Sequence, residues 1–358
     1  MTADCLKLTV YFGERDRLDG HLVSDVLLDL YQRHGLRAAI LVRGVEGFGI
    51  KHRLHTQRLL TLSEDMPLVT VAVDTRERIE AVLPDVQAVL CGGLVTLERA
   101  RLVTDIDGAA PLPVERHDAT KLTLTLGRQE RVRGRPAHLW AVDVLRRHGV
   151  AGATVVVGVD GIVHGARRRA RFFSANADVP LMVISVGAGS AIAAALAELG
   201  ASLERPLLAL ERVRVCKRDG IVVGAPSHLP ETDRSGLGVW QKLMVYAGEQ
   251  ARAGRHPLYI ELIHRLRLEG AAGATAVRGT WGYSGDHAPH GDRLFAVRRR
   301  VPVIVSVVDR PEAARRWWGV IDALTTEAGL VTSEMVPAFR AVGPGLASGG
   351  LRLARLDL

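Results

Sequence analysis

The chain has few cysteines and few aromatic residues. Its three cysteines, Cys5, Cys91 and Cys216, are isolated in the sequence and odd in number. This pattern argues against a disulfide framework and favours a reduced, cytoplasmic protein. Aromatic residues make up only 4% of the chain. Any hydrophobic core must therefore be built mainly from Val, Leu, Ile and Ala.

Long apolar runs and known catalytic motifs are lacking as well. No stretch of about 18 apolar residues occurs, so no membrane-spanning helix is expected. The first seven residues carry no apolar segment, and we expect no secretory leader. Ser/His/Asp sets, a Gly-Lys-Ser/Thr phosphate loop and paired carboxylates at diagnostic spacing are missing. The sequence therefore predicts neither catalytic residues nor an enzyme.

Positive charge is in moderate excess. The 358 residues include 47 Lys+Arg and 39 Asp+Glu, which gives a net charge of +8. Such a balance favours anionic partners, namely phosphorylated ligands, nucleic acid or an anionic membrane face. Because the basic residues are dispersed, a solvated arginine-rich surface is the better interpretation, and nucleic acid is not expected as a partner.

The dominant feature is a threefold internal repeat. An alternating stretch that begins with Lys at residues 7–13 returns at 121–127 and again at 242–248. The copies are offset by 114 residues (7 to 121) and by 121 residues (121 to 242). A glycine turn after the next apolar run, at Gly44, Gly158 and Gly279, keeps both offsets. Two landmarks in register predict three copies of one structural unit.

Each copy has the same order of predicted elements. The first strand is followed by an amphipathic helix that ends at a glycine (Gly35, Gly149 or Gly270). A short strand, the glycine turn, a strand led by proline, a second helix and a last strand complete the unit. We expect the second helices over about 76–90, 190–199 and 312–328, and the last strands over 93–98, 207–211 and 329–334. This is the α+β ferredoxin-like βαββαβ pattern.

The three units are expected to pack together rather than to form beads on a string. Their strands are apolar on both faces and the linkers are short, so the sheets should meet around a pseudo-threefold axis. We divide the chain into repeat 1 (5–103), a linker (104–119), repeat 2 (120–216), a linker (217–239), repeat 3 (240–340) and a tail (341–358). The predicted state is a compact monomeric pseudo-trimer, not a homotrimer.

The repeat, the Gly47-Phe48-Gly49 turn and the phrase His55-Thr56-Gln57-Arg58-Leu59-Leu60-Thr61-Leu62-Ser63-Glu64-Asp65-Met66-Pro67 resemble the DUF190 family of the nitrogen-regulatory PII-like superfamily. Repeat 1 is the best match, and repeat 2 keeps the phrase only in part, as Asn176-Ala177-Asp178-Val179-Pro180. The resemblance implies a trimer of ferredoxin-like units fused into one polypeptide. It also implies a T-loop between the second and third strands of each unit and adenine nucleotides bound in the clefts between units. Members of the family accompany fluoride-exporter genes, which implies regulation of a membrane transporter.

The predicted ligand-binding residues surround the three glycine turns. Backbone N–H groups in such turns, with basic side chains nearby, suit a phosphate. The alternative is that the glycines only shape the loops and that the basic run of repeat 2, at Arg167, Arg168 and Arg169, is a solvated face. The predicted set comprises Arg43, Gly44, Gly47, Gly49, Lys51, His52, Arg53, Gly158, Gly161, His164, Gly279 and Gly282.

Other polar residues are interpreted as structural. His287 and His290, with Asp286 and Asp292, form the one local pattern for a metal, and we interpret these histidines as lone polar side chains, so no metal is expected. Lys7, Lys121 and Lys242 recur in the first strands, and Glu98, Glu211 and Glu334 recur in the last strands. If these strands pair, each Lys–Glu couple is predicted to be a structural ion pair.

The leading hypothesis is a PII-like regulatory protein. It would bind a small anionic effector, expected to be an adenine nucleotide, without any covalent cofactor. It would pass its state through the loops to a partner, expected to be a membrane transporter. A ligand-free interaction scaffold for such a transporter is the alternative hypothesis, and an enzyme is the third.

Overall fold

The computed structural model describes residues 2–49, 54–56, 66–103, 118–169, 179–284, 290–291 and 301–342. The predicted ligand-binding residues Lys51, His52 and Arg53, and also His287, lie outside the described residues. Within the described residues, no helix is long and apolar enough to cross a membrane.

Three βαββαβ repeats are present, as the sequence predicts. Repeat 1 consists of β1 (Thr2–Gly13), α1 (Val23–Arg33), β4 (Ala38–Arg43), β7 (Pro67–Thr75), α2 (Arg76–Val89) and β8 (Gly93–Val103). Repeat 2 consists of β9 (Asp118–Gly127), α3 (Ala137–Arg147), β12 (Gly152–Val157), β15 (Pro180–Gly187), α4 (Gly189–Ser202) and β16 (Leu207–Arg218). Repeat 3 consists of β18 (Trp240–Gly248), α5 (Leu258–Leu268), β21 (Ala274–Arg278), β24 (Pro302–Asp309), α6 (Pro311–Leu324), β25 (Leu330–Val336) and β26 (Ala338–Val342).

Several boundaries differ from the prediction. Helix α6 ends at Leu324, four residues before the predicted end, and α4 extends to Ser202. The last strands are longer than expected, and β16 runs to Arg218, inside the predicted linker. That linker also holds the short strand β17 (Ile221–Val222), which pairs with the end of β16. The last strands are long because their second halves pair with a neighbouring repeat.

Short hairpins precede the first helix of each repeat. They are β2 (Arg17–Leu18) with β3 (His21–Leu22), β10 (Arg131–Val132) with β11 (Arg135–Pro136), and β19 (Arg252–Ala253) with β20 (His256–Pro257). The helices that follow end at glycines with left-handed backbone, Gly35, Gly149 and Gly270. Only glycine adopts this conformation without steric cost, so the predicted helix ends are confirmed.

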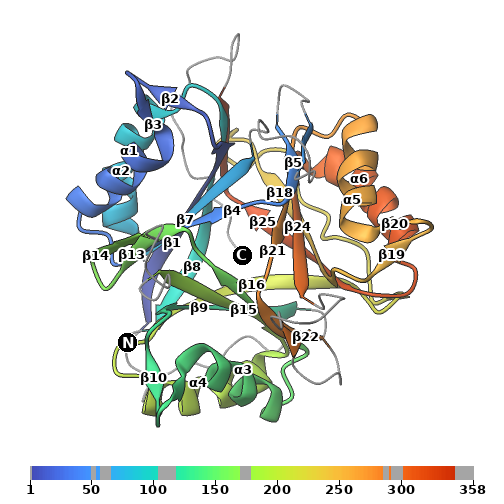
Figure 1. Cartoon of the computed structure of the whole chain (residues 1–358). Coiled ribbons are helices and arrows are strands. Elements are labelled where there is room, and N and C mark those ends of the chain that lie inside the picture. The colour runs from blue at the N-terminus through green and yellow to red at the C-terminus, as the bar shows by residue number, and fades with distance from the viewer. Residues whose placement is uncertain are drawn as a thin grey trace.

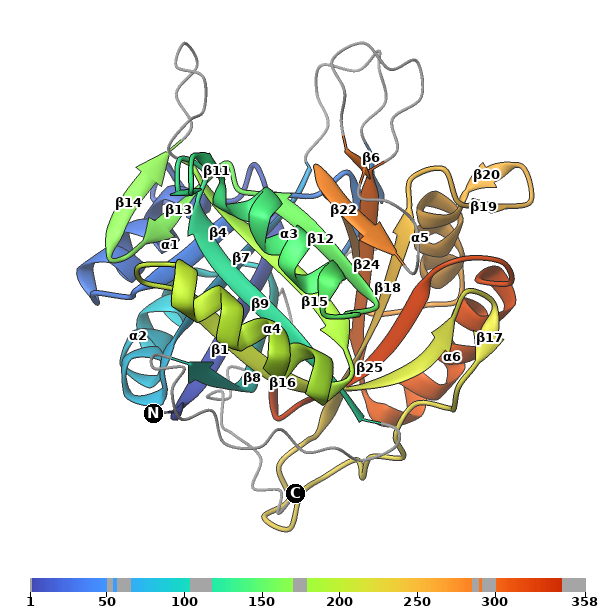
Figure 2. The ribbon, with the colours of Figure 1, turned by 90° about the horizontal axis from the view of Figure 1, so that it is seen from below.

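Each repeat has its own core between the sheet and its two helices. Along β1, Leu6, Leu8 and Val10 belong to the core shared with α1 and α2, whereas the alternate residues Lys7 and Thr9 belong to the opposite face of the sheet. Figure 1 shows the three helix pairs on the outside and the three sheets in the centre, and Figure 2 shows α3 and α4 covering the sheet of repeat 2. The inner faces also meet in an apolar cluster that all three repeats supply, with Ile40, Val156 and Ile304 among its residues.

The last strands of the three repeats pair with one another in a cycle. Residues 101–103 of β8 pair with residues 208–210 of β16, and residues 214–218 of β16 pair with residues 330–333 of β25. Strand β26 returns to residues 93–97 of β8 and closes the cycle. The second half of each last strand thus pairs with the first half of the next, so within the described residues the last strands leave no open edge.

A second cycle is formed by three short strands that follow the glycine turns. These crossing strands are β5 (Glu46–Phe48), β13 (Asp160–Val163) and β22 (Trp281–Ser284). Strand β5 of repeat 1 pairs with β21 of repeat 3, β13 of repeat 2 with β4 of repeat 1, and β22 of repeat 3 with β12 of repeat 2. One strand of each repeat therefore pairs with the sheet of a neighbouring repeat, which explains why three ferredoxin-like units form one closed body.

Candidate functional site

The glycines of the predicted ligand set lie where the crossing strands approach a neighbouring repeat. The amides of Gly44, Gly158 and Gly279 donate to the carbonyls of Pro67, Pro180 and Pro302 at 2.8, 2.9 and 2.7 Å. These N–H groups are therefore already paired. Phosphate binding by these glycines stays a prediction, and any contact with a ligand there must use other groups.

The second glycine of each turn lies close to the backbone of the neighbouring repeat. A Cβ atom at Gly161 would lie 2.2 Å from the carbonyl oxygen of Ala39, and one at Gly282 would lie 2.3 Å from that of Ala153. At Gly47 the corresponding distance to the carbonyl oxygen of Ala274 is 2.9 Å. Glycine is thus required for strand contact between repeats. Around Gly49, in contrast, a Cβ atom would meet nothing within 4 Å.

The basic side chains near the turns are engaged in ion pairs. Arg43 pairs with Glu14 at 2.7 Å, and His164 lies 3.6 Å from Glu130. The interpretation of the basic run of repeat 2 as a solvated face is wrong for Arg167, whose side chain is 17% exposed and contacts three carboxylates. Sequence reasoning missed this cluster because two of the carboxylates belong to a helix of repeat 1.

A cavity of about 1400 Å³ lies between repeats 2 and 3. Repeat 2 supplies the end of α3 and the adjoining ends of β12 and β15. Repeat 3 supplies the end of β18, the crossing strand β22 and the residues before β25. Of the predicted ligand residues, Gly282 lines this cavity, which we call the 2–3 cleft. Its size is sufficient for a nucleotide-sized molecule.

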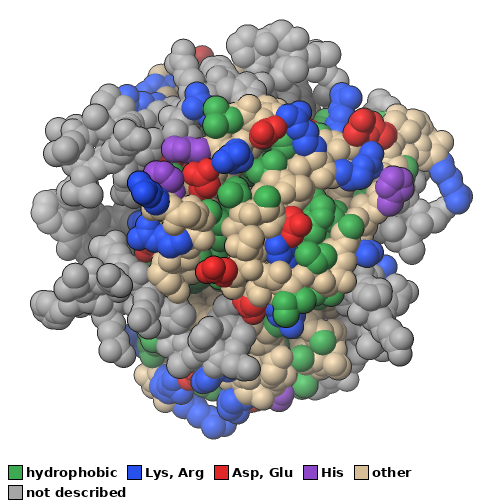
Figure 3. Space-filling model, turned by 90° about the vertical axis from the view of Figure 1, so that its right-hand side faces the viewer, with side chains coloured by type: hydrophobic (Ala, Val, Ile, Leu, Met, Phe, Trp, Pro, Cys, Tyr) green, Lys and Arg blue, Asp and Glu red, His purple; other side chains and the backbone are tan. Residues whose placement is uncertain are grey.

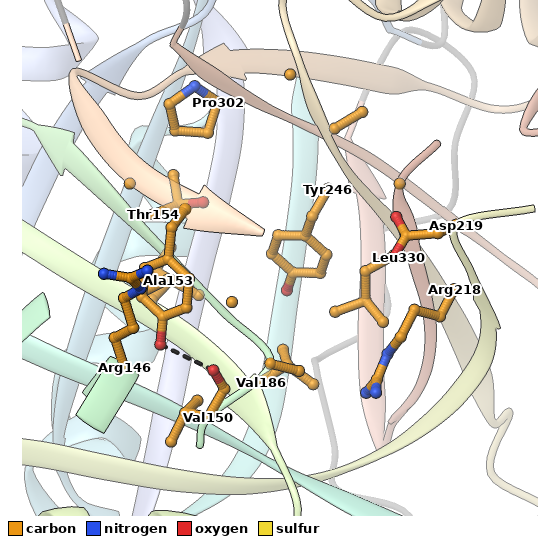
Figure 4. Close-up of a pocket in the computed structure, with 18 of the residues that line it drawn as sticks. Arg146, Val150, Ala153, Thr154, Val186, Arg218, Asp219, Tyr246, Pro302 and Leu330 are labelled. Atoms are coloured by element: carbon orange, nitrogen blue, oxygen red, sulfur yellow. Dashed lines mark hydrogen bonds between the residues drawn. The ribbon is translucent and has the colours of Figure 1, made fainter. Parts of the chain in front are cut away.

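Two arginines dominate the chemistry of the 2–3 cleft. Arg146 and Arg218 lie on opposite sides of it, with the ring of Tyr246 between them (Figure 4). Within the part of the chain that the structure describes, neither guanidinium forms an ion pair, whereas Arg135 and Arg147 of the same wall pair with Asp143 and Glu198. Both unpaired guanidiniums can bind anionic groups.

Much of the remaining lining is apolar or accepts hydrogen bonds. Val186 and Leu330 supply an apolar surface beside Tyr246. Burial raises the pKa of the Tyr246 hydroxyl well above its usual range, so this group stays neutral. The carboxylates of Asp219 and Glu327 also line the cleft and can accept hydrogen bonds from a ligand. The cleft thus suits a ligand with an anionic group near Arg146 and hydrogen-bond donors at the other end.

These residues carry no recognisable signal in the sequence. Arg146 lies near the helix-ending Gly149, and nothing in the sequence distinguishes it from the many other surface arginines. Arg218 and Asp219 fall in the predicted linker. On the face of the molecule shown in Figure 3, basic and acidic side chains are interspersed.

The recurring Lys and Glu residues form a buried charge ring on the axis. In the strand register Lys7 lies opposite Glu98, Lys121 opposite Glu211 and Lys242 opposite Glu334. The predicted couples are therefore confirmed as strand partners. All six residues are at most 6% exposed.

Contacts between repeats link the couples into one ring. Lys7 lies 2.7 Å from Glu98 and also pairs with Glu211 of repeat 2. Lys121 lies 3.3 Å from Glu211 and also pairs with Glu334 of repeat 3. Lys242 pairs with Glu98 of repeat 1. Each ammonium thus neutralises a carboxylate of another repeat, and the ring is neutral as a whole.

Lys121 and Glu98 of the ring keep their charges throughout the neutral pH range. Burial works to lower the pKa of Lys121, but the carboxylates of Glu211 and Glu334 outweigh it and raise that pKa. Burial works to raise the pKa of Glu98, but Lys242 and Lys7 hold it well below its usual range. The three carboxylates lie within 4.8 Å of one another. They do not suit a metal ion, because three ammonium groups already neutralise them.

Acid is expected to destabilise the protein through this ring. The pKa values of Glu98 and Glu334 are lowered in the folded protein, whereas an unfolded Glu titrates near about 4.3. The stability that they contribute is therefore complete above about pH 4.3 and is lost as the pH falls through the lowered values. Urea unfolding between pH 7 and pH 3 would show this loss. A free energy of unfolding that does not fall below pH 4 would contradict it.

His138 titrates in a separate pH range and supplies the control for the acid destabilisation of the charge ring. Burial, with repulsion from Arg128 and Arg131, lowers the pKa of His138 to about 4. Its contribution is complete above about pH 6.5, the usual value for His, and is lost from there down to its folded pKa. His138→Gln should remove the decline between pH 6.5 and 4 and leave the steeper decline at lower pH.

Three segments of the chain, residues 5–102, 119–215 and 240–338, match the model of the family DUF190, described as "Uncharacterized ACR". A UPF0166 protein of Methanocaldococcus jannaschii is 28% identical over 83 residues, which cover 23% of this chain and 76% of that protein. Two UPF0166 proteins of Aquifex aeolicus are 25% identical over 96 residues and 28% identical over 95 residues. These matches cover 27% and 26% of this chain, and 90% and 93% of the relatives.

Each of these relatives thus corresponds to about one repeat. Among solved structures, aspartate kinase from Synechocystis superposes with a TM-score of 0.27 at 10% identity, covering 94% of this chain and 52%, about half, of that protein. This likeness is too weak to support any argument about fold or function.

Proposed function

Because this chain belongs to the DUF190 family, we propose that it is a PII-like regulatory protein that binds a small anionic effector between its repeats. The observation that carries the proposal is the 2–3 cleft, in which Arg146 and Arg218 face the same cavity without ion-pair partners among the described residues. An adenine nucleotide suits the site, since its phosphate would meet a guanidinium and its amino and hydroxyl groups would meet carboxylates.

Binding is favoured over catalysis by the same lining. Among the described residues of the 2–3 cleft there is no His, Ser, Cys or Lys. His, the commonest general base, and the Ser, Cys and Lys nucleophiles are therefore not at hand, and the carboxylates that line the cleft have no such partner there. The effector would instead change how the molecule presents its loops to a partner. A membrane ion transporter such as a fluoride exporter is the partner that we propose.

The route from ligand to loop is short. Gly282 and Tyr283 line the cleft and belong to β22, which immediately precedes the segment in which the T-loop of repeat 3 is expected. The Tyr283 hydroxyl donates to the carbonyl of Val150 at 2.8 Å, so β22 is tied to the segment that follows α3 in repeat 2. A ligand in the cleft would contact this junction directly and shift β22.

Calorimetric titration with ATP, ADP, AMP, cyclic AMP and cyclic di-AMP tests the proposal. At least one ligand is expected to bind, and Arg146→Gln should weaken it about tenfold or more, since a hydrogen bond to a charged group contributes about 1.5–3 kcal/mol. Because Arg146 is exposed, its substitution should leave the thermal unfolding midpoint unchanged. No binding by any of these ligands at near-millimolar concentration would contradict the proposal.

A further inference from the structure

The three interfaces between repeats differ at one symmetry-related position. The first residue of each crossing strand is Glu46 in β5, Asp160 in β13 and Trp281 in β22. These residues lie opposite Ala276, Leu41 and Val155, which are themselves equivalent positions of the neighbouring repeats. Two interfaces therefore place a carboxylate where the third places an indole ring.

Between repeats 1 and 2 this position is closed by an ion-pair cluster. Arg167 lies 2.7 Å from Asp160 and 3.0 Å from Asp25 of α1, and it also pairs with Asp29 of α1. Arg169 adds a contact of 3.0 Å to Asp25. The side chain of Asp160 is 4% exposed. Opening this cluster would leave a buried carboxylate unpaired, which is costly.

Between repeats 3 and 1 a smaller polar contact occupies the equivalent place, and we call this contact and the ion-pair cluster of Asp160 clamps. Glu46 of β5 lies 3.4 Å from His264 of α5, and its side chain is 4% exposed. His264 on α5 and Asp29 on α1 are equivalent positions of the repeat. Both interfaces thus join the crossing strand to the first helix of the neighbouring repeat through polar side chains.

At the 2–3 interface the described residues form no ion pair at this position, and the crossing strand is held instead by the hydrogen bond from the Tyr283 hydroxyl to the carbonyl of Val150. The equivalent helix residue is Asp143, which pairs with Arg135 of its own repeat at 2.7 Å. Trp281 instead packs against the core of repeat 2. Beside it lies the cavity of about 1400 Å³. The exchange of a carboxylate for an indole therefore coincides with an open cleft.

The following inference rests on the proposed function. We propose that the chain binds one effector rather than three and that this effector occupies the 2–3 cleft. The side-chain clusters around Asp160 and Glu46 close the other two clefts. The ligand class is a molecule with an anionic end, held by Arg146, and a donor-bearing end beside Asp219 and Glu327. One chain would then report one ligand-binding event through a single pair of repeats, although it contains three copies of the unit.

The repeat supplies a matched control for this proposal. Arg267 on α5 is the equivalent of Arg146 on α3 and belongs to the interface between repeats 3 and 1. In a calorimetric titration of the full chain with the nucleotide that binds best, we expect a stoichiometry near one. Arg146→Gln should weaken binding about tenfold or more, and Arg267→Gln should leave it within about twofold.

The outcomes separate this inference from the proposed function. A stoichiometry near three, or equal weakening by Arg146→Gln and Arg267→Gln, would overturn the single-site inference and leave effector binding intact. No binding by any nucleotide would overturn both. Circular dichroism and thermal unfolding of both variants would establish that they fold like the parent.

Discussion

Replacing Lys121 by methionine is expected to lower the free energy of unfolding by about 3–5 kcal/mol, as is typical when one partner of a buried ion pair is removed. Lys121 pairs with Glu211 of its own repeat and with Glu334 of repeat 3. Methionine retains much of the volume of lysine but leaves both carboxylates without that ammonium. Urea unfolding at pH 7, followed by circular dichroism, measures the loss.

The control for this variant is Lys217→Met. Lys217 is also buried but pairs with Asp322, whose side chain is 40% exposed. Water can therefore solvate the carboxylate that remains, and the loss should be clearly smaller. In addition, Lys121→Met combined with Glu334→Gln should cost less than the sum of the two single changes, because fewer unpaired charges remain. A loss below about 1 kcal/mol for Lys121→Met would contradict the role assigned to the ring.

Gly161→Ala is expected to cost about 3 kcal/mol, the upper end of the usual range for overpacking. The added Cβ would lie 2.2 Å from the carbonyl oxygen of Ala39, 2.7 Å from the ring of Pro180 and 2.9 Å from the Cα atom of Ile40. Ala39 and Ile40 belong to β4 of repeat 1. The clash therefore separates β13 from its neighbour and weakens the interface between repeats 1 and 2.

The same substitution at Gly319 provides the control. Gly319 is exposed within α6, and a Cβ atom there would meet nothing within 4 Å. Alanine is favoured over glycine in a helix by about 0.5–1 kcal/mol. Gly319→Ala should thus raise the thermal unfolding midpoint, and Gly161→Ala should lower it. Equal effects of the two changes would contradict the requirement for glycine in the crossing strand.

The sequence predicted the fold well because the repeat is visible in local patterns. Alternation in residues 7–13 and the helix-ending Gly35 depend on near neighbours in the chain, and the constant offsets extended these assignments to all three copies. The partners of the crossing strands could not be predicted, because Gly161 is compatible both with a phosphate loop and with close strand contact. Only the three-dimensional arrangement shows that the carbonyl of Ala39 occupies that space.

The charge ring and the cleft were predicted to different degrees. The recurrence of Lys and Glu in register revealed the couples, but their convergence into one ring depends on how the three sheets meet. Arg167 and Asp25 are far apart in the sequence, so their ion pair could not be read from it. Arg146 and Arg218 resemble many other arginines of the chain, and only their shared cavity distinguishes them.

Because the last strands pair in a closed cycle, their pairing does not depend on which repeat comes first along the chain. Thr2 pairs with Val103 and Val342 pairs with Gly93, so both described chain ends lie along β8. The two ends of that strand are about 33 Å apart at the usual rise per residue. Residues 343–358, when extended, can reach about 53 Å. A circular permutant opened within residues 104–117 and joined through this tail should close in the same way, with the repeats in the order 2, 3, 1.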